Sequence, residues 1–95
     1  MTCLYIVSRT IKTSDETLLG LLGNNDAIIF IGDGVNSLIN PQSLALIKSF
    51  SGKIFYLADD AKSRAVISPN QKFIASTYLD FVELTVQFPR SITWY

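Results

Sequence analysis

Short, largely apolar runs alternate along the chain with segments rich in polar side chains. The runs cover residues 4–7, 27–31 and 53–57. A run with almost no polar positions predicts a strand buried on both faces, as in a parallel sheet covered by helices on both sides. The repeated order of strand and helix therefore predicts an α/β fold, built as a small doubly wound layered structure.

Signals for a helix start follow each predicted strand. Residues 13–16 offer a hydroxyl N-cap with acids in the first turn, and Asp33 is predicted to cap the helical stretch after the second strand. That stretch is interrupted near residue 40 and restarts with Pro41 in its first turn. Asp59 or Asp60 is predicted to cap a brief third helix.

The last third of the chain supports two interpretations. A turn at residues 68–70 and a fourth strand at 73–76 are followed by residues 82–88, which alternate as a strand does but also form a helical apolar face. A parallel partner for a final strand at residues 92–94 requires a crossover of about a dozen residues, usually a helix. Topology therefore favours a helix over the alternation.

Length and composition predict one domain that spans residues 1–95. The chain has 95 residues, of which 48% are hydrophobic and 17% charged. A chain of this size buries only roughly 60 to 65% of its unfolded surface, so this much apolar material exceeds what one small core absorbs. We expect part of it to lie in a subunit interface.

Charge and the reactive residue types exclude several classes of function. Eight basic and eight acidic residues balance, and the basic residues are scattered singly, which is atypical of a surface that binds nucleic acid directly. The chain has no histidine, which removes the usual proton shuttle and the commonest zinc ligand. A single cysteine, no signal-peptide pattern and no long apolar run predict a cytoplasmic protein. Because the usual reactive residue types are missing, we expect no catalytic residues, no bound metal and no cofactor.

The most enzyme-like motif is the glycine-rich turn after the second predicted strand. Gly32, Gly34 and Ser37 approach the dinucleotide fingerprint, but they do not open the first unit, and Asp33 would repel a phosphate. A phosphoacceptor receiver needs acids directly after the first strand, where this chain has none at residues 8–10. A flavin carrier needs a glycine-rich loop at the same place, and this loop has no glycine. We interpret the turn as a structural corner and keep a small-ligand-binding domain as an alternative.

Cys3 is the one candidate for a covalent sulfur carrier. It opens an apolar strand without an obvious activating cation or helix N-terminus, so we interpret it as a buried thiol and keep a persulfide carrier as an alternative. The pairs of acids at 15–16 and 59–60 fit helix starts better than a catalytic pair. Trp94 and Tyr95 are candidate interface residues, because both types are enriched where proteins bind one another.

The order of these segments resembles the TusB/DsrH family, the small subunit of TusBCD and DsrEFH-like sulfur-relay complexes. The resemblance rests on the apolar strands, the turn at residues 33–35, residues 56–64, residues 80–85 and Trp94 near the end. It implies a three-layer α/β/α domain of DsrE-like, flavodoxin-like topology, with a mostly parallel sheet of about five strands. It also implies that residues 80–87 are helical.

The resemblance further implies function and partners. Family members assemble with homologous C- and D-type subunits into a heterohexamer, a dimer of heterotrimers, that passes persulfide sulfur towards 2-thiolation of the tRNA wobble uridine. The D-type subunit holds the sulfur-carrying cysteine. Some relatives of the DsrH branch have a cysteine in the first helix, where this chain has residues 17–19 without a thiol. This difference favours the tRNA-modification branch and a subunit without its own active site.

Overall fold

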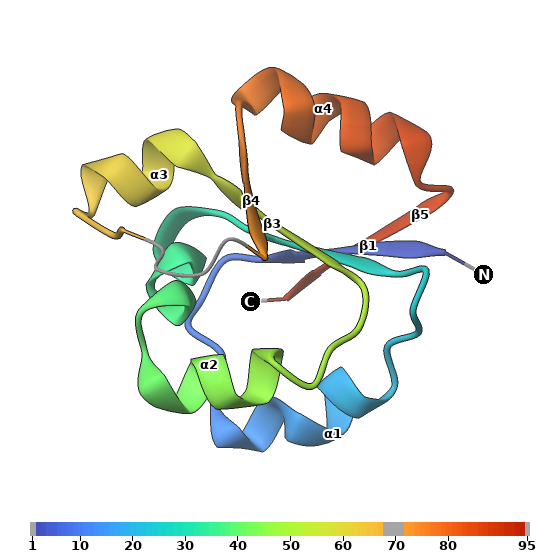
Figure 1. Cartoon of the computed structure of the whole chain (residues 1–95). Coiled ribbons are helices and arrows are strands. Elements are labelled where there is room, and N and C mark those ends of the chain that lie inside the picture. The colour runs from blue at the N-terminus through green and yellow to red at the C-terminus, as the bar shows by residue number, and fades with distance from the viewer. Residues whose placement is uncertain (1, 68–71, 95) are drawn as a thin grey trace.

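The computed structural model describes residues 2–67 and 72–94 and contains one five-stranded sheet (Figure 1). Its strands are β1 (Cys3–Val7), β2 (Ala27–Phe30), β3 (Lys53–Leu57), β4 (Phe73–Ser76) and β5 (Arg90–Trp94). Every pairing is parallel. The predicted α/β class and the parallel sheet are confirmed, while the turn predicted at residues 68–70 lies outside the described residues.

Helices connect the strands in the predicted alternation. They are the 3-10 helices η1 (Thr13–Asp15) and η2 (Gly32–Leu38) and the α-helices α1 (Glu16–Gly20), α2 (Pro41–Ile47), α3 (Ala58–Ser63) and α4 (Tyr78–Gln87). The stretch after the glycine-rich turn is thus a 3-10 helix, and the α-helix restarts at Pro41 as predicted. Within the described residues, no helix combines the length and the apolar character needed to cross a bilayer.

Strand order decides which helices cover which face of the sheet. The order is β4-β3-β2-β1-β5, which differs from the flavodoxin order 2-1-3-4-5 within the same class. The chain advances in one direction from β1 to β4 and then returns to the far side of β1. Because crossovers between parallel strands are right-handed, the return helix α4 lies opposite α1 and α2 (Figure 1).

The sequence ambiguity in the last third is resolved in favour of the helix. The Thr77 hydroxyl accepts a hydrogen bond from the Asp80 amide at 3.1 Å, and the Asp80 carboxylate accepts one from the Thr77 amide at 3.0 Å. This reciprocal capping box satisfies two amides that a helix start would otherwise leave unpaired. The alternating pattern at residues 82–88 therefore predicted the wrong structure, and the topological argument predicted the right one.

The sheet separates two apolar cores of unequal size. The larger core lies on the face covered by α1, η2 and α2, and it includes the fully buried Phe30 and Ile47. The smaller core lies under α4, where Leu84 packs with Leu4 and Ile29. α4 is thus the sole source of buried helical side chains in the smaller core, among the residues that the structure describes.

Three helix starts differ from the sequence prediction, and the one at Asp33 is described with the glycine-rich corner. No hydroxyl caps the first helical segment, whose N-cap is Lys12. α3 begins after Leu57, and neither Asp59 nor Asp60 caps it with a side-chain hydrogen bond. Both acids lie in the first turn of α3, where the helix dipole favours them, but Asp60 has a different partner, described below.

Gly34 is required at the corner between β2 and η2 because the chain passes close to β1. A Cβ atom at this position would lie 2.1 Å from the carbonyl oxygen of Val7. No side chain fits that distance, and the obstacle is backbone in the sheet interior. Gly32, at φ +51°, adopts a left-handed conformation that glycine tolerates best.

We predict that Gly34→Ala lowers the free energy of unfolding by about 2 to 3 kcal/mol, because β1 and η2 must separate to admit the methyl group. Gly20→Ala is the matched control, since nothing lies within 4 Å of a Cβ there and alanine is the better helix former. Urea denaturation followed by circular dichroism measures both variants. Equal stability of the two variants would contradict this account of the corner.

Candidate functional site

The glycine-rich corner carries hydrogen bonds that leave little for a phosphate. The Gly32 amide donates to a carboxylate oxygen of Asp60 at 2.7 Å, and the Gly34 amide donates to the Ile31 carbonyl at 2.8 Å. The acid from the β3 to α3 corner thus occupies the position that an anionic ligand would take. This arrangement supports the interpretation of the turn as a structural corner.

Asp33 does not cap a helix, contrary to the sequence prediction. Its carboxylate lies 3.1 Å from Nε of Arg64, at the end of α3, and its side chain is 76% exposed. The η2 segment has no side-chain cap. An exposed aspartate can reach a cation on the neighbouring corner, so Asp33 links the β2 and β3 corners across the surface instead of serving its own helix.

Ser37, the third position of the fingerprint, holds the loop after β1. Its hydroxyl accepts a hydrogen bond from the Ile11 amide at 2.9 Å, and the Ser43 hydroxyl donates to the Ile11 carbonyl at 2.5 Å. Both serine side chains are fully buried. Two hydroxyls from η2 and α2 therefore satisfy the backbone of one buried loop residue, which gives Ser37 a structural role.

A partly buried ion pair between Arg9 and Asp15 is the main feature that sequence reasoning missed. Two guanidinium nitrogens of Arg9 donate to the two carboxylate oxygens at 2.7 Å each, and the Lys12 amide donates to the same carboxylate at 2.8 Å. The bonds from Arg9 lower the pKa of Asp15, and the pKa of Arg9 is raised by the same contact. The pair closes the loop between β1 and α1.

The only signal for this pair was opposite charge a few residues apart, on the two sides of a short polar segment. That signal is weak, because most such residues point into solvent. Asp15 was instead interpreted as an ordinary acid in the first turn of a helix, which it also is. Its fork-shaped contact with Arg9 depends on the loop folding back on itself, and no local pattern encodes that.

Cys3 is buried at the start of β1, with 7% of its surface exposed. Its amide donates to the carboxylate of Asp26 at 2.9 Å, and the same carboxylate accepts the Gly23 amide at 2.8 Å. Burial hinders the approach of a persulfide donor to the thiol. The geometry therefore supports a packing role for Cys3, and the absence of a sulfur-carrying role stays a prediction.

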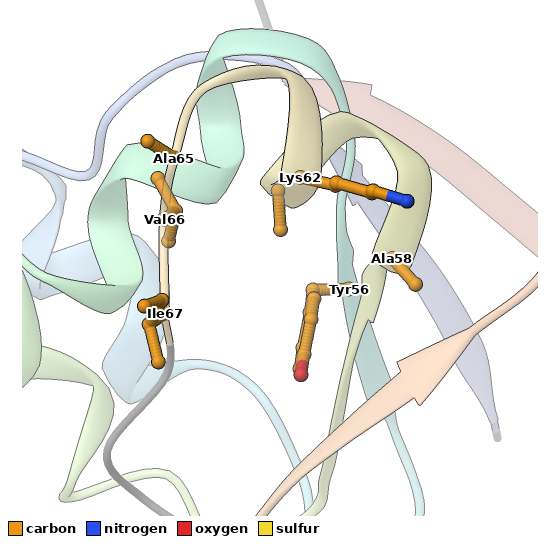
Figure 2. A pocket seen from close by; sticks show the side chains of 7 residues that line it. Tyr56, Ala58, Lys62, Ala65, Val66 and Ile67 are labelled. Atoms are coloured by element: carbon orange, nitrogen blue, oxygen red, sulfur yellow. The ribbon is translucent and has the colours of Figure 1, made fainter.

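A concavity of about 380 Å³ lies between α3 and the segment that follows it (Figure 2). Tyr56 stands in it between Ala58 on one side and Val66 and Ile67 on the other. Its volume is in the range of ligand sites, but such sites place several polar groups around the ligand. Among the described lining residues only Tyr56 and Lys62 carry a polar side-chain group, so the concavity lacks the constellation of a built site.

Trp94 is directed mainly at the protein's own core. Its ring meets Tyr5 edge to face, with centroids 5.6 Å apart and an interplanar angle of 67°. Its carbonyl accepts a hydrogen bond from the Ser8 hydroxyl at 3.1 Å, which ties the end of β5 to the end of β1. Trp94 remains partly exposed, so an interface role stays a prediction, and Tyr95 lies outside the described residues.

Four large exposed apolar side chains lie on α4, away from the residues that pack on the sheet. We define the α4 surface as these four residues: Tyr78, Leu79, Val82 and Val86. Leu79 and Val86 are 73% and 80% exposed. Large exposed apolar residues elsewhere in the described chain are distributed over several elements. Surfaces of this kind normally mark contact with another molecule.

The fold is that of a small parallel α/β/α protein, and in this chain internal carboxylates and hydroxyls hold the loops at the strand ends. The chain belongs to the DsrH-like family: a sequence model described as "DsrH like protein" matches residues 8–91. The resemblance noted in the sequence is thereby confirmed at the level of the family.

Comparison with individual proteins agrees with this assignment. A protein named TusB from Yersinia enterocolitica is 33% identical over 96 residues, with 96% of this chain and 99% of the relative covered. Another protein named TusB, from an Enterobacter strain, is 30% identical over 81 residues, with 83% and 85% covered. The similarity extends over nearly the whole length of these relatives.

Solved structures support the fold alone. The ychN protein from E. coli superimposes with a TM-score of 0.71 at 12% identity, covering 99% of this chain and 100% of that protein. Tm0979 from Thermotoga maritima superimposes with a TM-score of 0.62 at 19% identity, covering 90% and 92%. The architecture is thus shared by proteins whose sequences have diverged widely.

We predict that Asp15→Asn lowers the free energy of unfolding by about 2 kcal/mol at pH 7, since Arg9 loses both charged hydrogen bonds. The pKa of Asp15 is lowered in the folded chain, so its contribution is complete above the unfolded value of about 3.9 and is lost as the pH falls through the folded value. The difference in the free energy of unfolding between wild type and Asp15→Asn should therefore become smaller in acid. Denaturation curves recorded at several pH values measure this difference.

Asp33→Asn is the control for this experiment, because it breaks the exposed pair with Arg64. We expect a change of about 0.5 kcal/mol or less. A loss for Asp15→Asn that stays constant between neutral and strongly acidic pH would show that the ion pair is not its source.

Proposed function

We propose that this chain is a non-catalytic subunit of a sulfur-relay complex that passes persulfide sulfur towards 2-thiolation of the tRNA wobble uridine. The observation that carries the proposal is the similarity, over 96% of the chain, to a protein named TusB. Its partners are homologous C- and D-type subunits, which join it in a heterohexamer built as a dimer of heterotrimers. The relay operates in the cytoplasm, where tRNA is modified.

The role of the chain in this complex is structural: it packs against the partner that carries the sulfur. In each transfer a thiolate attacks the outer sulfur of a persulfide, the sulfur–sulfur bond breaks, and the donor cysteine leaves as a thiolate. The cysteine that carries the sulfur belongs to the D-type partner. This chain supplies a rigid neighbour that helps to form the walls of the partner's reactive site.

The side chains described above support a structural role. The carboxylates of Asp15, Asp26 and Asp60 each accept a hydrogen bond from a loop amide. In the loop after β1, the Ser37 hydroxyl accepts from the Ile11 amide and the Ser43 hydroxyl donates to the Ile11 carbonyl. Groups that are occupied in this way hold the scaffold rigid. Trp94 and Tyr95 are proposed to extend the contact with a partner at the edge of the sheet, next to β5.

The second candidate function is a direct persulfide carrier through Cys3. One observation favours it: Arg90 of β5 is the register partner of Cys3, so a basic residue stands next to the cysteine in the sheet. The burial of Cys3 opposes it. A free-standing ligand-binding domain, the remaining alternative, receives no support from the corner at Gly32, whose amide is bonded to Asp60.

Replacing Cys3 by serine separates the two candidates. We expect cells that carry Cys3→Ser as their only copy to retain wild-type levels of thiolated tRNA, measured by mass spectrometry of digested tRNA, because the subunit transfers no sulfur itself. Loss of thiolation with intact assembly would refute the non-catalytic role. A variant of the carrier cysteine in the D-type partner serves as the positive control and should abolish thiolation.

Assembly tests the proposal more directly. Co-expression with the homologous C- and D-type subunits, followed by native mass spectrometry, should give a complex with a mass equal to two copies of each subunit. A chain that stays apart from both partners would contradict the proposed function.

A further inference from the structure

We propose that the α4 surface is the docking face for a different α/β subunit, one that presents an apolar face flanked by lysine or arginine. This inference rests on the proposed function and adds to it the location and chemistry of the contact. The α4 surface consists, as defined above, of Tyr78, Leu79, Val82 and Val86.

The first argument is the incomplete cover of one face of the sheet. Five strands at about 4.8 Å spacing give a sheet roughly 24 Å wide, whereas one helix with its side chains is about 10 Å across. Strand order places α4 alone over this face. Phe55 and Leu57 of β3 remain partly exposed on it, and Ile74 of β4 is 42% exposed. The part of this sheet face that lies beside α4 is therefore not covered by another helix of the described chain.

The second argument is the distribution of apolar residues around α4 itself. Leu84 and the partly buried Phe81 already pack on the sheet. Tyr78, Val82 and Val86 follow one another at intervals of four residues, so they form a continuous stripe on another side of the same helix. A helix that merely covered a core would carry polar residues at these positions. An apolar stripe on both sides indicates that α4 is packed between two layers.

The third argument concerns charge and selects the kind of partner. A groove of about 200 Å³ lies between α4 and the β3–β4 edge, and its lining includes Phe55, Ile74, Asp80 and Glu83. Among the described lining residues none is basic, and α4 carries Asp80 and Glu83 without a lysine or arginine. A partner that covers this surface must therefore bring positive charge to its rim.

The same charges argue against a second copy of this chain. A symmetric dimer through the α4 surface would bring two α4 helices together, and α4 carries no lysine or arginine that could offset Asp80 and Glu83 of the other copy. Like charges across an interface disfavour association. A homologous subunit with the same layered fold but a basic rim satisfies both the apolar stripe and the acidic groove.

The size of the surface is consistent with the core of such an interface. α4 is about 15 Å long and, with its side chains, about 10 Å across, so its outer side covers roughly 150 Å² and can form only the centre of an interface. Each partner in a stable complex contributes about 800 Å², with an apolar centre and a polar rim. The α4 surface provides the centre, and the groove with Asp80 and Glu83 provides part of the rim.

Leu79→Gln tests the docking face, and Leu21→Gln is its matched control. The two leucines are 73% and 77% exposed, but Leu79 lies on α4 and Leu21 lies just after α1 on the opposite side of the sheet. Titration of each purified variant against the purified partner subunits should show a dissociation constant at least tenfold higher for Leu79→Gln and unchanged for Leu21→Gln. The unfolding midpoints of both variants should match that of wild type.

Glu83→Lys tests the charge of the rim, with the exposed Glu16→Lys on α1 as control. We expect Glu83→Lys to weaken partner binding severalfold and to reduce its dependence on salt, while Glu16→Lys changes neither. Sedimentation of the chain alone should show a monomer. A homodimer that Leu79→Gln dissociates would overturn the choice of partner.

The possible failures are distinguishable. If wild type binds the partner subunits and Leu21→Gln weakens binding while Leu79→Gln does not, the docking face is wrong and the proposed function stands. If wild type binds neither subunit, both the docking face and the proposed function fail.

Discussion

The handedness of one crossover determines most of this structure. The chain lays down β1 to β4 in one direction and then returns β5 to the free edge of β1, which reverses the direction of travel. A right-handed connection can make that return only across the opposite face of the sheet. Three layers follow, with most helices on one side and α4 on the other. The larger core, the smaller core and the apolar outer side of α4 are all consequences of that single reversal.

The acidic side chains show how a small protein provides hydrogen-bond acceptors for its backbone amides. Parallel strands end in loops whose amides have no partner in the sheet, and buried amides without acceptors are costly. Asp15, Asp26 and Asp60 each supply a carboxylate to such amides. Asp15 and Asp60, one member of each pair of neighbouring acids in the sequence, therefore hold loops in place.

Much of the fold was predictable because the strands are short, apolar and separated by clear helix signals. The need for a crossover and the family resemblance both predicted a helix in the last third of the chain, whereas alternation alone predicted a strand. The bond from Gly32 to Asp60 and the fork between Arg9 and Asp15 escaped prediction. They depend on where loops come to lie after the sheet has formed, and residue order does not contain that information locally.

The pairing of β5 with β1 has a consequence for the order of folding. Cys3 pairs with Arg90 and Val7 with Trp94, so a strand that is synthesised after β2, β3 and β4 completes the environment of β1. Until residues 90–94 have been made, β1 has an open edge whose amides and carbonyls can pair with any other extended segment. Contacts between such distant parts of a chain form slowly. The nascent protein therefore passes through a stage at which a nearly complete sheet is also at its most prone to aggregation.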